Sequence, residues 1–194
     1  MLALPLFAVI TACVTGPRPT LTDPEPVDDG AAAPVIERLD RAPVGDFTAV
    51  YAITPSAAAA ATVATVSRHG NELRAQIGDV VYTTNGVTTT TCDVDGGACE
   101  DYANETRISN LGITHQFWGP AFRQRLAVDS GRRIGTSTGT VETIAGQSAA
   151  CVAVTLPSSI GATGTVNYCA LDQGVLGRYV GADATIELTS FTVA

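Results

Sequence analysis

Short runs in which apolar and polar residues alternate cover most of the chain after residue 45. Alternation with a period of two, in runs rich in Val, Thr, Ile and Tyr, predicts β-strands, and the Gly, Asn and Asp residues between the runs predict turns. The runs fall into two series, and the second is spaced like a meander. Strands are expected at residues 47–53, 62–68, 72–77, 79–84, 87–94, 139–144, 149–156, 165–171, 174–180 and 184–193.

One stretch between the two series has the helical pattern. Residues 119–131 carry a proline near the start and a glycine at the end, which suit the first helical position and a helix stop. Phe122 and Leu126 lie four residues apart, and Trp118 extends their face by one turn. Such a stripe is either ordinary core or a ligand-binding surface. We therefore expect a mainly β (α+β) fold, with a large curved antiparallel sheet or half-barrel and a short helical cover on one face.

The beginning of the chain differs from the rest. Residues 1–12 are apolar and uncharged, which matches the apolar region of a signal peptide without its usual basic start. The segment Ile-Thr-Ala-Cys at residues 10–13, where this apolar run ends, resembles the bacterial lipobox, in which the cysteine receives a diacylglycerol. This resemblance implies a lipidated Cys13 with acyl chains such as palmitate in the outer leaflet of a cell membrane. The alternative is a buried cysteine in an N-terminal strand.

The segment after the lipobox is rich in proline and charge. Residues 14–45 hold six of the ten prolines, and six acidic residues against three arginines. A segment of this composition is typical of a disordered tether, although a short helix at 34–41 also fits the pattern. The expected organisation is a lipoprotein signal peptide (1–12), a lipidated Cys13 with a Pro-rich tether (13–45) and a single β-rich extracytoplasmic domain (46–194).

The other four cysteines are expected to form two disulfides. An Asp-Gly turn between Cys92 and Cys99 places these residues opposite each other, and folding about the loop 157–164 places Cys151 opposite Cys169. Directly opposed residues of an antiparallel pair lie at a separation that a disulfide tolerates. A four-cysteine zinc site is the alternative, but neither pair has the CxxC spacing of a zinc knuckle.

Composition and charge narrow the function classes. The formal net charge is −8, and all 11 basic residues are arginine. No basic patch is evident, so nucleic acid is not an expected partner. The use of arginine alone, with abundant Ala, Gly, Thr and Val, is typical of a high-GC bacterium. The longest apolar run, 1–12, is shorter than the roughly 20 residues of a membrane-spanning helix.

No group of residues has a recognisable catalytic or metal-binding pattern. GTSTG matches the GxSxG motif around Ser137, but a strand pattern follows and no histidine lies downstream, which excludes a hydrolase elbow. His69 and His115 are unconnected by any ligand spacing and are interpreted as surface or hinge residues. The chain is therefore not expected to be an enzyme or to hold a metal or cofactor. A solvated acidic turn rather than a calcium loop is expected from the spacing of Asp93, Asp95, Glu100 and Asp101.

The whole arrangement is similar to a known family. Lipobox, Pro-rich tether, cysteine-bearing strands, a central helix and C-terminal strands containing YCALDQGVL (168–176) together resemble actinobacterial cell-envelope lipoproteins of the LolA and LprG/LppX kind. The resemblance implies a curved half-barrel whose helices cover an apolar cavity. It further implies a membrane-anchored envelope protein that binds or carries a lipid or other hydrophobic ligand, with Trp118, Phe122 and Leu126 as the ligand-binding candidates. The alternative is a non-carrier surface or sensory module that binds another envelope protein.

Overall fold

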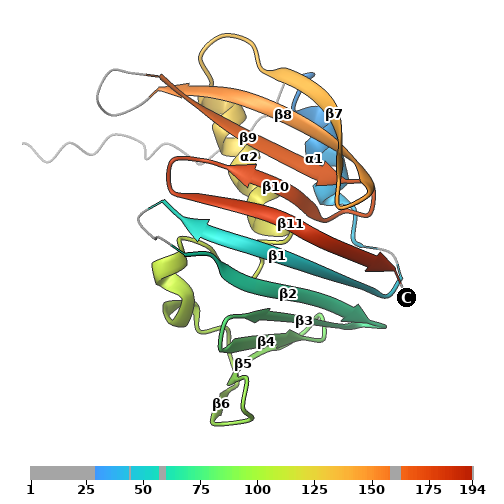
Figure 1. Cartoon of the computed structure of the whole chain (residues 1–194), viewed down its shortest axis with the longest axis vertical. Coiled ribbons are helices and arrows are strands. Elements are labelled where there is room, and N and C mark those ends of the chain that lie inside the picture. The colour runs from blue at the N-terminus through green and yellow to red at the C-terminus, as the bar shows by residue number, and fades with distance from the viewer. Residues whose placement is uncertain (1–28, 44, 57–59, 158–162, 194) are drawn as a thin grey trace, which may run out of the picture.

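One large antiparallel sheet organises the molecule (Figure 1). The computed structural model describes residues 29–43, 45–56, 60–157 and 163–193. Eleven strands lie in the order β6-β5-β4-β3-β2-β1-β11-β10-β9-β8-β7, and neighbouring strands are antiparallel. The sheet thus consists of two meanders, β1–β6 and β7–β11, which are joined by the pairing of β1 with β11.

The predicted strands are all present. They are accompanied by β6, a short strand that the alternation pattern does not reveal because it has two residues. The mainly β class and the large antiparallel sheet are confirmed. The strands are β1 (Phe47–Pro55), β2 (Thr62–His69), β3 (Glu72–Ile77), β4 (Val80–Thr84), β5 (Thr89–Asp93), β6 (Cys99–Glu100), β7 (Thr138–Ile144), β8 (Gln147–Pro157), β9 (Thr163–Leu171), β10 (Leu176–Val180) and β11 (Ala184–Val193).

The two cysteine pairs lie opposite each other in the sheet. Cys92 is the cross-strand partner of Cys99 on β5 and β6, and Cys151 is the partner of Cys169 on β8 and β9. Both pairs form disulfides, and these are the two pairs that turn geometry predicts. A left-handed glycine, Gly96, makes the first turn possible. Local turn chemistry is therefore enough to set the register of the Cys92–Cys99 hairpin.

The core lies on one face of the sheet. Alternate residues of β1, among them Phe47, Ala49 and Tyr51, are buried, while the residues between them are partly exposed. Helix α2 (Pro120–Arg132) contacts β8, helix α1 (Ala33–Asp40) contacts α2, β8 and β9, and the short 3₁₀ helix η1 (Glu105–Leu111) contacts β1. In Figure 1, α1 and α2 lie behind the upper part of the sheet.

Helix α2 begins at Pro120, the predicted first helical position, and ends at Arg132, one residue beyond the predicted glycine stop. Gly119 is its N-cap and a proline follows at the first helical position, as the sequence indicates. Phe122 and Leu126 are buried on the side of the helix that meets the sheet. The ring of Phe122 lies 4.6 Å from that of Tyr179, centroid to centroid. The helical pattern thus identified both the helix and its buried face.

The predicted tether is wrong for residues 29–43. Ala32, Val35 and Leu39 are buried in the same core as the sheet residues, and α1 (Ala33–Asp40) lies within this segment. Their spacing gives the helix an apolar face, and the short helix that the pattern at 34–41 also allowed is present as α1. Arg38 and Asp40 tie the helix down through ion pairs with Asp172 and Arg123, both at 2.7 Å. Residues 1–28, including Cys13, lie outside the described residues.

No helix in the described part of the chain combines the length and the hydropathy that crossing a bilayer requires.

Candidate functional site

A pocket of about 350 Å³ lies beside Trp118, at the ends of β2, β3 and β4. Its volume is within the usual range for small-molecule sites. Leu73 belongs to the face of β3 that also carries the buried residues Ala75 and Ile77, so the pocket opens on the core-bearing face of the sheet. We call it the Trp118 pocket, and it is lined by Ala42, Pro43, Arg68, Asn71, Leu73, Thr84, Asn85, Gly86 and Trp118.

The floor of the pocket is a row of cross-strand neighbours. Arg68 on β2 is the partner of Leu73 on β3, and Leu73 is the partner of Thr84 on β4. Opposed residues of antiparallel strands point to the same side, so these three side chains lie next to one another. The floor therefore combines a cation, an apolar side chain and a hydroxyl.

Trp118 forms a wall of the pocket because its backbone is fixed to the sheet. The Leu176 N–H donates to the Trp118 carbonyl at 2.6 Å, and the preceding Phe117 is buried edge-on against the ring of Tyr51, at 5.1 Å. The Trp118 Nε1 group is buried and has no hydrogen-bond partner among the described residues. An unpaired buried N–H is destabilising by about 1–3 kcal/mol.

Arg68 supplies the positive charge of the pocket. Its Nε donates to the Gly70 carbonyl at 3.0 Å, which fixes the guanidinium at the β2–β3 turn. The Asp46 carboxylate is engaged elsewhere, because it accepts a hydrogen bond from the Gly70 N–H at 2.8 Å and lies 3.5 Å from His69. This hydrogen bond from the Gly70 N–H is the main reason why the pKa of Asp46 is lowered, and the charge of Arg68 also contributes to lowering it.

The three predicted ligand-binding residues are separated in the structure. Trp118 lines the pocket, whereas Phe122 and Leu126 lie in the core and line neither of the pockets described here. Phe122 packs against both Tyr168 and Tyr179. The stripe was interpreted either as ordinary core or as a ligand-binding surface. Phe122 and Leu126, which lie within the helix, are core residues. Trp118, which precedes the helix, forms the wall of the pocket.

A polar network lies behind Phe122. Arg125 donates to both carboxylate oxygens of Asp183 at 2.7 and 2.9 Å, and Tyr179 donates to the same carboxylate at 2.7 Å. Burial disfavours the charged form of Asp183, but these hydrogen bonds outweigh it and lower its pKa. Burial, followed by the hydrogen bond to Asp183, raises the pKa of Tyr179. Because every member is partnered and the network joins α2 to the half-buried end of the β10–β11 hairpin, it is interpreted as structural.

A second polar cluster surrounds η1. His115 is largely buried and pairs with Glu105, and its ring stacks on that of Tyr82 at 5.1 Å. Tyr82 donates to the Asn104 carbonyl at 2.8 Å. Burial, followed by the charge of Glu105, raises the pKa of Tyr82 to about 12. Of the interpretation of His115 as a surface or hinge residue, the surface part is therefore wrong, because Glu105 supplies a partner that allows the ring to be buried.

A second pocket, of about 410 Å³, lies between α1 and strands β7 and β8. Small side chains and Arg38 form most of its lining, and Arg38 pairs with Asp172. The Trp118 pocket is the stronger candidate for a binding site, because it combines an aromatic wall with an arginine that has no carboxylate partner among the described residues. The lining of this second pocket is Gly30, Ala31, Pro34, Arg38, Gly139, Thr140, Val141, Ala150 and Cys151.

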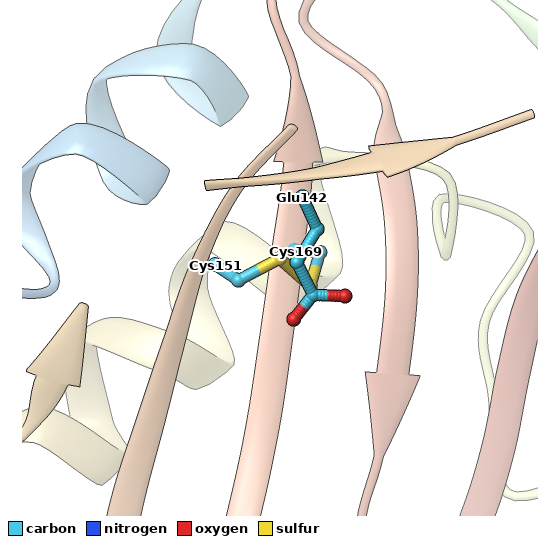
Figure 2. A group of neighbouring side chains, drawn as sticks. All are labelled: Glu142, Cys151 and Cys169. Carbon is cyan, nitrogen blue, oxygen red and sulfur yellow. A yellow bond between two sulfur atoms is a disulfide. The ribbon is translucent and has the colours of Figure 1, made fainter. Parts of the chain in front are cut away.

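Glu142, Cys151 and Cys169 bring three possible metal-ligating groups together, with their ligand atoms within 4.8 Å of one another (Figure 2). Both sulfurs belong to a disulfide, so neither is the thiolate that a metal ion requires. Glu142 accepts a hydrogen bond from Arg178 at 2.6 Å. With the disulfide formed, this group is an ion pair packed over a crosslink.

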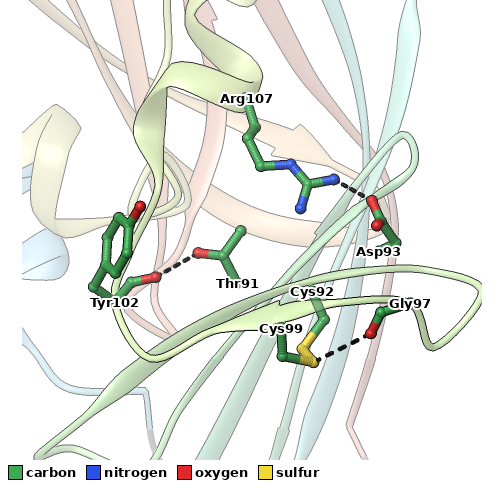
Figure 3. Close-up of a disulfide and its surroundings, with 7 residues drawn as sticks. All are labelled: Thr91, Cys92, Asp93, Gly97, Cys99, Tyr102 and Arg107. Carbon is green, nitrogen blue, oxygen red and sulfur yellow. Dashed lines mark hydrogen bonds and ion pairs between the residues drawn. A yellow bond between two sulfur atoms is a disulfide. The ribbon is translucent and has the colours of Figure 1, made fainter.

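The hairpin of β5 and β6, which carries Asp93 and Glu100, is held in place by side-chain contacts (Figure 3). Asp93 pairs with Arg107, and Thr91 donates to the Tyr102 carbonyl at 2.7 Å. Glu100 accepts hydrogen bonds from Tyr102 and from the Asn104 side chain. The carboxylates of Asp93 and Glu100 thus help to hold the hairpin, which favours the interpretation as an acidic turn.

Ser137 lies in a setting unlike a nucleophile elbow. Its hydroxyl donates to Asp29 at 2.6 Å, and β7 begins at the next residue. An elbow requires a helix after the serine, and the structure has a strand there.

The comparisons with known proteins give no family. No family model matches the chain, and no curated protein matches it. Among solved structures, the crystal structure of MucB matches with 10% sequence identity and a TM-score of 0.44. The match covers 84% of this chain and 58% of the MucB chain, so this chain spans less than two thirds of MucB. A likeness at this level carries no argument about function.

Sequence reasoning missed Arg68 as a site residue. A signal for it exists, because Arg68 follows Ala64 and Val66 on the core-facing positions of β2. A cation at a core-facing position, next to a turn, indicates a pocket or an ion pair.

Proposed function

We propose that this protein is a membrane-anchored bacterial envelope lipoprotein that binds a hydrophobic ligand in the Trp118 pocket and catalyses no reaction. The lipobox at residues 10–13 supports an anchor on Cys13 at the extracytoplasmic face of the cell membrane. Two disulfides support an oxidising compartment. In this proposal the membrane is a partner through the N-terminal lipid, and nucleic acid is not a partner.

The Trp118 pocket is the observation that carries the proposal. Trp118, Leu73 and Pro43 offer an apolar surface that a hydrocarbon chain can cover, and such contact is favourable by about 25 cal/mol for each Å² removed from water. We further propose that the sheet curves around this face as a half-barrel and that the helices with Trp118 cover the ligand.

Native mass spectrometry with lipid extraction tests ligand binding. The full chain with Cys13→Ala, produced in an actinobacterial host, is expected to carry a lipid of defined mass. Leu73→Asp in the same chain should remove that lipid, because a carboxylate would lie on the pocket floor. Val63→Asp is the matched control, since Val63 lies on neighbouring β2 and is 62% exposed. Absence of lipid from the parent chain, or equal lipid in the Leu73→Asp chain, would contradict the proposal.

Intact mass measurement tests the anchor. The full chain from the membrane fraction should begin at Cys13 and carry the mass of a diacylglycerol, while the Cys13→Ala chain should leave the membrane fraction. An unmodified Cys13 would contradict the lipoprotein assignment without affecting the pocket.

A non-carrier module that binds another envelope protein is the second candidate. Exposed apolar side chains on the β4–β6 end of the sheet favour it, namely Val87, Val94 and Tyr102. If the chain carries no lipid, crosslinking from position 87 in the intact envelope should capture a single protein, and random capture would oppose this function.

A further inference from the structure

We infer that the Trp118 pocket selects amphiphiles whose apolar chain ends in an anionic group, and that Arg68 receives this group. The inference rests on the proposed function, because it names the class of hydrophobic ligand that the same pocket would take.

Arg68 lies at the edge of the apolar surface of the pocket. Its side chain lines the pocket directly beside Leu73, so the cation lies at the edge of the apolar surface rather than away from it. The hydrogen bond from Nε to the Gly70 carbonyl leaves the two terminal nitrogens for another acceptor. A planar guanidinium held in this way suits a carboxylate or a phosphate, which it binds through parallel hydrogen bonds.

Arg68 has no carboxylate partner among the described residues. In the part of the chain that the structure describes, six arginines form ion pairs with carboxylates, and Arg68 is not one of them. Asp46, the acid whose charge it influences, is engaged by the Gly70 N–H and by His69. The arginines in ion pairs are Arg38, Arg107, Arg123, Arg125, Arg133 and Arg178.

The net negative charge of the whole chain makes a local cation necessary for anion binding. A net charge of −8 repels anions at long range, so a general attraction for them is not expected. Selection of an anionic amphiphile therefore requires a local cation next to the apolar surface. Arg68 provides this arrangement in the Trp118 pocket.

The single tryptophan makes the test direct. The chain contains one Trp, at position 118, so its fluorescence reports occupancy of this pocket alone. We would titrate the full-length Cys13→Ala chain with decanoate, decyl phosphate and decanol, which share one apolar chain, below their micelle concentrations. Either anion should bind at least about tenfold more tightly than decanol, because hydrogen bonds to charged groups are the stronger class. The two anions distinguish a carboxylate from a phosphate headgroup.

The decisive variant is Arg68→Gln. It should weaken anion binding by about tenfold and leave decanol binding unchanged, whereas Arg68→Lys should retain part of the preference. Arg74→Gln is the matched control, because Arg74 lies next to Leu73 on β3 but points to the other face and donates to Gln76. Circular dichroism and thermal unfolding should show that all three variants remain folded.

The outcomes separate this inference from the proposed function. Equal binding of decanol and both anions, or anion binding that Arg68→Gln does not change, would overturn the inference while hydrophobic binding stands. Failure of all three ligands to bind would overturn both.

Discussion

The two halves of the sheet present the same face to different surroundings. On β9 and β10, Tyr168 and Tyr179 extend to Phe122 on α2, and their rings lie 5.2 Å apart. On β2 and β3 the corresponding core-facing positions include Ala64 and Ala75. We call β8–β11 with the two α-helices the packed half, and β2–β5 with Trp118 the pocket half.

The difference shows that α-helices close one continuous sheet face at one end, while at the other end the same face borders a pocket. The antiparallel backbone continues through both halves, and interiors are close-packed wherever side chains are large enough to meet. In the packed half the tyrosines fill the space below α2, and their hydroxyls bond to Asp129 and Asp183. In the pocket half a space remains beside Trp118, over Arg68, Leu73 and Thr84 at the ends of β2, β3 and β4.

The largest expected effect is that of Gly174→Ala in the packed half. A Cβ at Gly174 would lie 2.4 Å from the Arg41 carbonyl oxygen, and its φ of +81° is unfavourable for alanine. Because a backbone atom obstructs the new methyl group, we expect a loss of about 4 kcal/mol in the free energy of unfolding.

Urea unfolding measures the effect of this change. Gly131→Ala is the control, since it lies in α2 with open space around it, and it should be neutral or slightly stabilising. A Gly174→Ala protein as stable as the parent would show that the segment after α1 does not pack against the β9–β10 turn.

Truncation of two leucines compares the halves directly. Leu126→Ala should lower the free energy of unfolding by about 3 kcal/mol, because Leu126 is fully buried on the face of α2 that meets the sheet. Leu73→Ala should lower it by about 1 kcal/mol, because Leu73 is only partly buried at the pocket. Thermal unfolding of the two variants side by side checks the ranking. A reversed order would contradict the division into packed and pocket halves.

The two disulfides should differ in their resistance to reduction. Cys99 is exposed at the edge of the sheet, whereas Cys151 and Cys169 are buried. Access controls the attack of a thiolate, so dithiothreitol should open Cys92–Cys99 first. Loss of this loop alone should lower the free energy of unfolding by about 2.5 kcal/mol. Timed alkylation with mass spectrometry identifies the order, and simultaneous opening of both bonds would contradict it.

The smallest expected effect is a dependence on alkaline pH at Tyr82. Its folded pKa of about 12 exceeds the unfolded value of 10, so the folded protein holds the proton more tightly. Its contribution is therefore complete below pH 10 and is lost as the pH rises from 10 to 12. Tyr82→Phe should flatten this part of the stability curve, measured by urea unfolding. Tyr102→Phe is the comparison, because that ring is exposed and its pKa is raised mainly by the charge of Glu100; equal flattening in both variants would contradict a role for burial.

The fold followed from local patterns to a large extent. Period-two alternation predicted the strands, and the Asp-Gly turn before Cys99 placed that residue opposite Cys92, because turn geometry sets the register of a hairpin. Only part of the candidate site could be predicted from the sequence. Trp118 was singled out by its position before α2, but neither Arg68 nor Pro43 carries a local signal that connects it with Trp118.

The sequence by itself determined the strands, the main helix and both disulfide pairs, since each depends on residues close together in the chain. Tertiary structure decided the place of α1, the pairing of β1 with β11, the burial of His115 against Glu105 and the location of the pocket. These depend on segments that meet only after the sheet has assembled. Periodicity identifies the face that a strand or helix buries, but not what will lie against it, because that depends on the volumes of side chains brought from distant parts of the chain.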